Sequence, residues 1–161
     1  MSKNIFLSLI FISILYSCSG IKTVSYDKAR KLNLKKDYKT FLNGNEQIDL
    51  KKYYLDPENI FKITIDGKSE TIKISQINSA TESFSISEIE SKKFKSRYKI
   101  QTNDSISLVI LNGILVEGND KKKYKIDYDV VKTVTLLKDA SSTILNCGGN
   151  DGVNVLLITT E

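Results

Sequence analysis

Three stretches in the last third of the chain decide its fold: Leu108-Val-Ile-Leu-Asn-Gly-Ile-Leu-Val116, Val130-Val-Lys-Thr-Val-Thr-Leu-Leu-Lys-Asp-Ala140 and Gly152-Val-Asn-Val-Leu-Leu-Ile-Thr-Thr160. Asn112-Gly113 predicts a tight turn between strands over 107–111 and 114–116. A strand is expected over 132–137, followed by a helix over 140–146 with Asp139 as its N-cap. The near-continuous apolar run over 153–159 favours a central strand that is covered on both faces.

The middle of the chain alternates apolar and polar residues in short runs, which is typical of half-buried strands. Strands are expected over 38–42, 61–65, 70–75 and 98–102, with hairpin turns at Asn43-Gly44 and Asp66-Gly67. Helical turns are expected at Asp56-Pro57 and over 127–131, and a capping box from Ser85 to Glu88 predicts a helix over 87–95. The expected fold class is α+β, with a small mixed, mostly antiparallel sheet and a few short helices.

Residues 41–65 and 110–136 resemble one another without a gap in their second halves. Phe41-Leu-Asn-Gly44 parallels Ile110-Leu-Asn-Gly113, and the segment from Asp56 to Ile65 parallels that from Asp127 to Leu136. Two explanations stay open: a duplicated unit, and a chance recurrence of common strand–turn–strand grammar. In a duplication, the first copy would have lost its closing loop and strand.

The start of the chain has the pattern of an export signal. Lys3 is followed by 12 mostly apolar residues over 5–16, too few for a membrane span of roughly 20 residues. Leu15-Tyr-Ser-Cys18 then resembles the lipobox of bacterial lipoproteins. We expect removal of residues 1–17, acylation of Cys18, and a polar tether over 18–36 that is helical near 26–34; an ordinary cleaved signal peptide is the alternative.

Composition excludes several classes of function. The 161-residue chain has no His, which removes the commonest general base and metal ligand, and its two Cys rule out a disulfide framework or a Cys-rich metal site. The net charge is +5, and all but Arg30 and Arg97 of the 24 basic residues are Lys. Scattered lysines without an ordered set of stacking aromatics argue against nucleic-acid binding, and favour a solvated surface or attraction to anionic lipid headgroups.

No group of residues forms a convincing catalytic, cofactor or metal site. Ser141-Ser142-Thr143 fits a helix near its cap, and Asp127 with Asp129 fits turn capping better than a cation site. Cys147-Gly-Gly-Asn-Asp-Gly152 lacks the Gly-Lys-Ser/Thr ending of a phosphate loop and is expected to be a connecting loop. Asn103-Asp104-Ser105-Ile106 contains glycosylation-like patterns that are too short to assign. The only expected site is lipid attachment at Cys18.

The ordered set of C-terminal motifs resembles the plug domain of TonB-dependent outer-membrane receptors. Leu108–Val116 is similar to the family's strand, Asn-Gly turn and strand; 127–131 is similar to its Asp-rich turn; 134–143 and 152–160 are similar to its strand-to-helix segment and closing strand. The resemblance covers about residues 105–161. The expected organisation is therefore a signal peptide (1–17), a tether (18–36), an N-terminal part (37–104) and a plug-like part (105–161). If the duplication is real, the part over 37–104 is a degenerate repeat of the plug-like unit.

This resemblance implies a plug-like body without a barrel of its own, of a kind found among Bacteroidetes. The function expected is that of a non-enzymatic outer-membrane lipoprotein without a cofactor, an interaction or accessory module for envelope transport. Its partners would be the membrane, through the lipid anchor, and a TonB-dependent receptor or another envelope protein. A solute-binding lipoprotein that acts on its own is the alternative.

Overall fold

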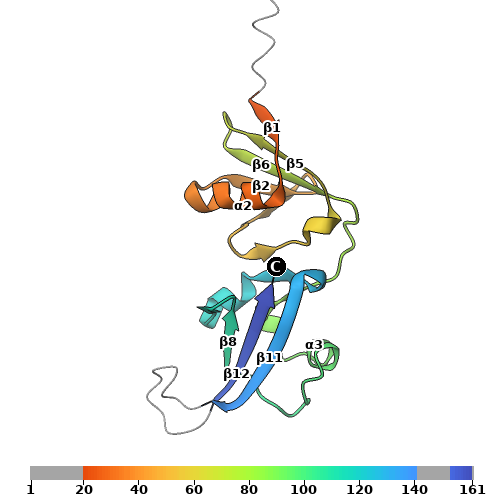
Figure 1. Cartoon of the computed structure of the whole chain (residues 1–161), viewed down its shortest axis with the longest axis vertical. Coiled ribbons are helices and arrows are strands. Elements are labelled where there is room, and N and C mark those ends of the chain that lie inside the picture. The colour runs from red at the N-terminus through yellow and green to blue at the C-terminus, as the bar shows by residue number, and fades with distance from the viewer. Residues whose placement is uncertain (1–19, 141–152, 161) are drawn as a thin grey trace, which may run out of the picture. The chain divides into compact units, whose positions relative to one another are not determined.

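The computed structural model describes residues 20–140 and 153–160, and it confirms the expected α+β class. Figure 1 shows short helices beside strands that form three mostly antiparallel sheets. The strands are β1 (Ile21–Thr23), β2 (Lys39–Leu42), β3 (Glu46–Ile48), β4 (Tyr53–Tyr54), β5 (Ile60–Asp66), β6 (Thr71–Gln76), β7 (Ser83–Ser85), β8 (Leu108–Leu111), β9 (Ile114–Leu115), β10 (Lys125–Asp127), β11 (Val131–Ala140) and β12 (Val153–Thr160). The helices are α2 (Tyr26–Lys35) and α3 (Lys92–Arg97), and the 3-10 turns are η1 (Pro57–Asn59), η2 (Ile86–Glu88), η3 (Gly118–Lys122) and η4 (Tyr128–Val130).

The described chain divides into two compact units. Unit 1 contains residues 20–48 and Ile60–Ile77, and unit 2 contains Asp49–Asn59 together with 78–140 and 153–160. This division differs from the expected boundary at 104/105. The reason is pairing across that boundary: β10 pairs with β4 in parallel and with β7 antiparallel, so segments from both sides form one sheet.

Unit 1 is a five-stranded sheet in the order β1-β5-β6-β2-β3, with α2 packed against β5. The inner face of the sheet carries aliphatic side chains at every second position, as in Ile63 and Ile65 of β5 and Ile72 and Ile74 of β6, and all four are buried. Ser25 begins α2 by accepting a hydrogen bond from the Lys28 backbone N–H.

The expected tether over 18–36 is replaced by structure from residue 21 onward. β1 pairs antiparallel with β5, and the expected helix near 26–34 is present as α2, with Ala29 fully buried. Few apolar residues occur in this segment, so sequence periodicity gave no strand signal. The chain nevertheless joins the sheet through backbone hydrogen bonds, which need no apolar side chain.

Unit 2 contains the three-stranded sheet β4-β10-β7 and the four-stranded sheet β11-β12-β8-β9. Its core includes an aromatic group in which the Phe84 ring lies 4.9 Å from both the Phe94 and the Tyr128 ring centroids. The expected central position of the last strand is confirmed, because β12 pairs antiparallel with β11 and in parallel with β8. The buried cluster consists of Tyr54, Phe84, Ile86, Ile89, Phe94, Ile106, Val109, Leu111, Val116, Ile126, Tyr128, Val130, Leu156 and Ile158.

The two units share one strand arrangement. The order β5-β6-β2-β3 in unit 1 corresponds to β11-β12-β8-β9 in unit 2, with the same parallel and antiparallel pairings. The ladder has a register shift at the same place in both, between Ile60 and Lys62 and between Val131 and Thr133. These correspondences support the repeat seen between 41–65 and 110–136. They also show that β6 occupies the place of β12, so the first copy has kept its closing strand.

In each unit an asparagine joins a hairpin to the strand that pairs in parallel with it. The hairpin is β2–β3 and the strand is β6 in unit 1, and they are β8–β9 and β12 in unit 2. Asn43 lies in the αL region (φ 47°), donates its backbone N–H to the Ile74 carbonyl, and bonds Gln76 through both ends of its amide. Asn112 (φ 49°) repeats this with the Ile158 carbonyl and with Thr160. Asparagine tolerates αL and offers a donor and an acceptor, so it suits both demands of this position. We call this arrangement the asparagine clasp.

Several local expectations are corrected. Residues 98–102 form a turn and an irregular segment rather than a strand, and the single helix expected over 87–95 is divided into η2 and α3. The Ser85–Glu88 capping box is present, but it opens η2. Asp139 does not cap a helix, because β11 extends through Ala140; residues 141–146 of that expected helix lie outside the described residues. The β5–β6 hairpin forms, with a four-residue loop over 67–70 in place of a two-residue Asp-Gly turn.

The asparagine clasp of unit 2 is expected to stabilise the fold measurably. Replacing Asn112 by Gly keeps the positive φ accessible but removes both side-chain hydrogen bonds, which should lower the free energy of unfolding by about 1–2 kcal/mol. Asn112→Asp keeps the acceptor for the Thr160 N–H and should lose less. Urea unfolding followed by circular dichroism measures both, and equal stability of Asn112→Gly and the parent chain would contradict this role.

Candidate interaction surface

The outer face of the β11-β12-β8-β9 sheet presents rows of apolar side chains. Leu156 and Ile158 of β12 face the core, so the alternate residues Val155 and Leu157 face outward. Cross-strand register then aligns Thr135, Leu157 and Ile110 in one row, and Leu137, Val155 and Leu108 in the next. Leu115 of β9 extends the first row beside Ile110. We call these seven residues the outer apolar face.

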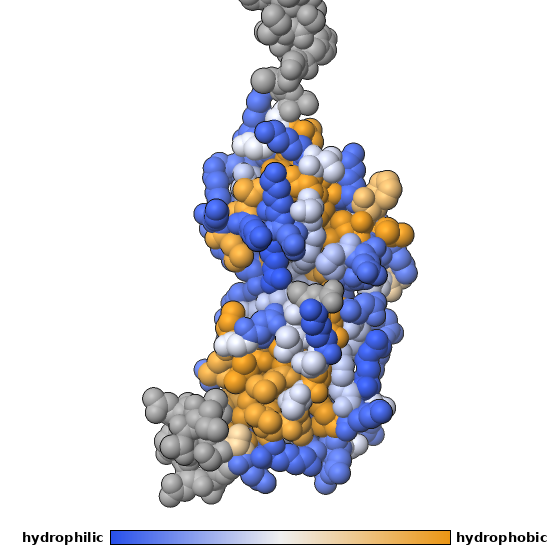
Figure 2. Space-filling model, viewed as in Figure 1, coloured by the Kyte–Doolittle hydropathy of each residue, from blue (hydrophilic) through white to orange (hydrophobic). Residues whose placement is uncertain are grey.

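This surface is open on the side shown in Figure 2, where apolar atoms gather over β8, β12 and β11. Leu115 is 44% exposed and Leu137 is 43% exposed, while Leu108, Ile110 and Leu157 are half-buried among their neighbours and Val155 is buried at 2% exposure. No described helix covers this face (Figures 1 and 2). The inner strand is thus central, as expected, but the described elements do not cover both of its faces. Contiguous apolar patches of this kind on a folded domain commonly mark contact sites.

Unit 1 provides an internal comparison for this surface. At the positions that correspond to Leu108, Leu137, Val155 and Leu157, the sheet of unit 1 has Lys39, Asp66, Thr71 and Lys73. The same strand arrangement therefore folds with charged and polar residues at these four positions, although Phe41 occupies the position of Ile110. The fold does not require apolar side chains at these four positions.

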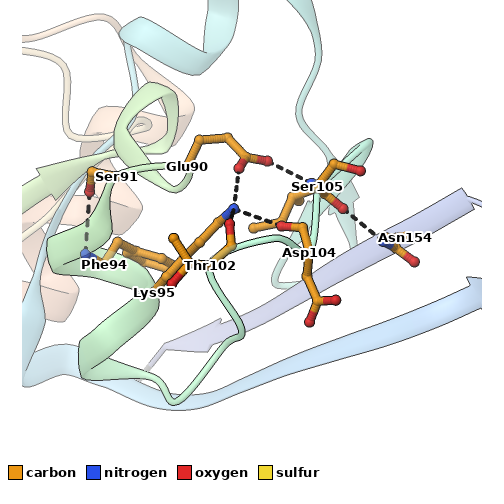
Figure 3. A network of polar contacts seen from close by, with 9 residues as sticks. Glu90, Ser91, Phe94, Lys95, Thr102, Asp104, Ser105 and Asn154 are labelled. Atoms are coloured by element: carbon orange, nitrogen blue, oxygen red, sulfur yellow. Dashed lines mark hydrogen bonds and ion pairs between the residues drawn. The ribbon is translucent and has the colours of Figure 1, made fainter.

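A polar network anchors the loop that leads into β8 (Figure 3). Lys95 of α3 is 4% exposed, and its ammonium group lies 2.5 Å from Oε2 of Glu90. The same group donates to the carbonyls of Thr102 (3.2 Å) and Asp104 (2.6 Å). All three Lys95 donors thus have acceptors, as a buried cation requires.

The other carboxylate oxygen of Glu90 accepts the backbone N–H of Ile106 at 2.6 Å, which fixes the loop next to its buried apolar residue. Asn154 of β12 donates to the Ser105 carbonyl, and Lys138 pairs with Asp104 at 2.8 Å. These contacts join α3, the loop, β11 and β12. These polar contacts therefore fix the backbone of the strands that carry the outer apolar face.

An aromatic group on the same side as α3 adds rigidity. The Tyr98 ring lies 4.8 Å from the Phe94 ring, and the Arg97 guanidinium lies 4.2 Å from the centroid of Tyr128. Burial raises the pKa of both the Tyr98 and the Tyr128 hydroxyl above the ordinary tyrosine value. Both phenols stay neutral at physiological pH, which is consistent with a structural role.

Asp127 is buried and does not cap its own turn. Its Oδ2 accepts the backbone N–H of Asp56 at 3.0 Å, whereas η4 receives no side-chain cap from Asp127. Burial is the main cause that raises the pKa of the Asp127 carboxyl, and the nearby Asp56 and Asp129 act in the same direction. Asp129 is exposed, and the described residues contain no group of three or more His, Cys, Asp or Glu able to hold a metal ion. The turn-capping role expected for Asp127 is thus replaced by a hydrogen bond that joins it to Asp56, 71 residues earlier in the chain.

Most of the remaining residues singled out from the sequence are not among those that the structure describes. Cys18, Ser141-Ser142-Thr143 and Cys147–Gly152 lie outside the described residues. Asn103–Ile106 belongs to the loop held by Lys95, with Ile106 buried. Among the described residues, no helix has the length and apolar character needed to cross a membrane.

Comparisons with protein-family models, with curated proteins and with solved structures return no match for this chain.

The outer apolar face was missed from sequence because its residues occur in continuous apolar runs, in which inner and outer positions look alike. The signal that could have found it is the contrast between the two repeats: alternate positions are charged in the first and apolar in the second.

The raised pKa of Asp127 predicts a pH-dependent loss of stability. The folded protein holds this proton more tightly than the unfolded chain does, so stability decreases as pH rises from the model carboxyl value of 3.8 through the folded pKa, and it stays lower above that pKa. Asp127→Asn keeps an acceptor for the Asp56 N–H and carries no charge. We expect it to have a higher urea midpoint than the parent chain at pH 7.

The advantage of Asp127→Asn should vanish at pH 3, where the parent carboxyl is protonated in both states. Asp129→Asn is the comparison variant, because that carboxyl is exposed and is only a minor cause of the raised Asp127 pKa, so its gain at pH 7 should be smaller. A lower midpoint for Asp127→Asn at pH 7 would show that the ionised carboxylate stabilises the fold.

Proposed function

We propose that the chain is a non-enzymatic outer-membrane lipoprotein, attached to the membrane through acylated Cys18, that acts as an interaction or accessory module in envelope transport. In this proposal the plug-like body works through contact with another protein. The partner we propose is a TonB-dependent receptor or another envelope protein. The absence of His from the sequence supports a role without catalysis.

The outer apolar face is the observation that carries this proposal. Interfaces between proteins have an apolar centre surrounded by polar residues. Here Leu137 and Leu157 lie at the centre of an apolar area, with the threonines of β11 and the Lys138–Asp104 ion pair at its border. The corresponding positions of unit 1 include Lys39, Asp66 and Lys73, which supports placing the proposed contact on unit 2. A rigid sheet loses little conformational entropy on binding, so such a face is suited to recognition.

Crosslinking at matched positions tests this assignment. Thr135 lies on the edge strand β11, next to Leu157 of the outer apolar face, and Thr64 is its counterpart in unit 1. A photo-crosslinking phenylalanine derivative at Thr135, in cells that make the native lipoprotein, should yield a discrete adduct with an envelope protein identified by mass spectrometry. The same derivative at Thr64 should not yield it.

A second test uses a variant of unit 2 that carries unit 1 side chains on its outer sheet face. Leu108→Lys, Leu137→Asp and Leu157→Lys together install the side chains found at the corresponding positions of unit 1, so the fold should survive. We expect an unchanged circular dichroism spectrum and loss of the Thr135 adduct. An adduct that persists in this folded variant, or equal adducts from Thr64 and Thr135, would remove the outer apolar face as the contact.

A groove in unit 1 favours the alternative of a solute-binding lipoprotein. It has a volume of about 570 Å³ on the outer face of the β1-β5-β6-β2-β3 sheet and is lined by Phe41, Thr64, Thr71 and Lys73, among others. A flat ring beside hydroxyl and ammonium groups suits a small polar solute with one apolar side. The groove is open, however, whereas most small-solute sites enclose their ligand, so the contact function remains the first proposal.

Thermal unfolding distinguishes this alternative. The unacylated mature chain is heated with a panel of free amino acids, monosaccharides and disaccharides. Under the alternative, one of them raises Tm in a concentration-dependent manner, and Phe41→Ala abolishes the shift. Unchanged Tm across the panel would argue against solute binding in this groove.

A further inference from the structure

We propose that the end of unit 1 next to the anchor is a binding surface for the anionic headgroups of a lipid bilayer. The surface consists of Lys22 of β1, Lys28 of α2 and Lys68 of the β5–β6 loop. This inference rests on the proposed anchor at Cys18 and adds a second attachment to it. A basic surface adds electrostatic attraction to anionic headgroups to the hydrophobic attachment that acyl chains provide.

The excess of positive charge is confined to the unit that follows the anchor. Unit 1 contains ten basic and five acidic residues over 20–48 and 60–77, which gives a net charge of +5. Residues 49–59 and 78–161 contain thirteen basic and fourteen acidic residues, so unit 2 is close to neutral.

Covalent reach brings these lysines near the membrane. Gly20 follows Cys18 by two residues, so at most about 7 Å separates their Cα atoms. Lys68 lies against Gly20, because a Cβ built on Gly20 would approach the Lys68 Cγ to 3.4 Å. The separation between the Cα atoms of Cys18 and Gly20 is shorter than the Debye length of about 8 Å at physiological ionic strength. Salt therefore screens little of the attraction between headgroups and the charges beside Gly20.

The three lysines line one hollow of about 450 Å³, together with Gly20, Thr23 and Tyr38. The hollow contains no acidic residue in its lining, and among residues 20–140 and 153–160 no carboxylate is paired with Lys22, Lys28 or Lys68. The neighbouring carboxylate of Asp66 instead accepts the Lys68 backbone N–H and the Ser69 hydroxyl. The nearby Asp66 carboxylate still interacts with the Lys68 charge, whereas no ion pair holds Lys22 or Lys28 among the described residues.

A second hollow continues the basic surface along α2. Lys28, Lys31 and Lys35 line it, with Asp27 as the only acidic member of that lining. Ile21, three residues after Cys18, is 58% exposed and can enter the headgroup region beside the acyl chains. Mobile lysine side chains match the changing positions of lipid phosphates better than the fixed geometry of a folded partner, which favours a bilayer as the occupant.

Vesicle binding by the unacylated mature chain tests the surface apart from the anchor. The full mature chain with Cys18→Ser is mixed with phosphatidylcholine vesicles that either contain or lack phosphatidylglycerol, at physiological ionic strength. We expect binding to the anionic vesicles only. Each lysine near a charged surface contributes roughly a five-fold factor, so Lys22→Gln, Lys28→Gln and Lys68→Gln together should weaken binding by about 100-fold.

A control of equal charge comes from unit 2. Lys92→Gln, Lys121→Gln and Lys122→Gln remove the same number of charges at positions outside the basic surface and should change the affinity by less than about three-fold. Equal losses from the two triple variants would show that only net charge matters and would overturn the site. Absence of binding to anionic vesicles, or equal binding to both vesicle types, would overturn it as well.

The anchor is checked separately by the intact mass of the protein recovered from membranes. A bare thiol at Cys18 would refute the proposed acylation without affecting the vesicle result. Acylation combined with a failed vesicle experiment would leave the anchor in place and refute the headgroup surface.

Discussion

Each unit depends on an inner strand that is hydrogen-bonded on both sides, β6 in unit 1 and β12 in unit 2. On one side the partner is antiparallel and close in sequence; on the other it is parallel and comes from a much earlier segment, β2 or β8. Parallel pairing requires a long excursion of the chain before the strand closes the sheet. The asparagine clasp fixes the C-terminal end of the inner strand, because the asparagine that forms the hairpin turn also hydrogen-bonds to that end.

Because both units satisfy this constraint in the same way, their differences lie on the surfaces that the constraint leaves unspecified. Unit 1 has mostly charged and polar residues on its outer sheet face, with Phe41 among them, and it carries Lys22, Lys28 and Lys68 near Gly20. Unit 2 has leucines and isoleucines on the corresponding face, above a polar network that holds its backbone. One scaffold therefore supports two chemically different surfaces, and the proposals for membrane and protein contact follow from that difference.

Much of the fold follows from the sequence because alternation and turn chemistry act locally. The strands at 38–42, 61–65 and 70–75 and the Asn112-Gly113 turn are found within a residue or two of their expected places. Errors arose where tertiary contacts replace local signals. Ile100 and Tyr98 look like strand residues, but they are partly buried and pack against the core from an irregular segment. Lys95 gave no sign of burial, because enclosing it requires Glu90 and two carbonyls from a later loop.

The assignment of Asp49–Asn59 to unit 2 has a consequence for how the chain can be divided. The backbone passes from one unit to the other three times, after residues 48, 59 and 77, and β4 enters the sheet of unit 2 from the middle of unit 1. No single cut yields two complete halves: a fragment beginning at residue 78 lacks β4, and one ending there carries a segment with no sheet to join. Despite their internal likeness, neither unit is a contiguous segment of the chain. A fragment made by one cut therefore cannot contain one complete unit and nothing of the other.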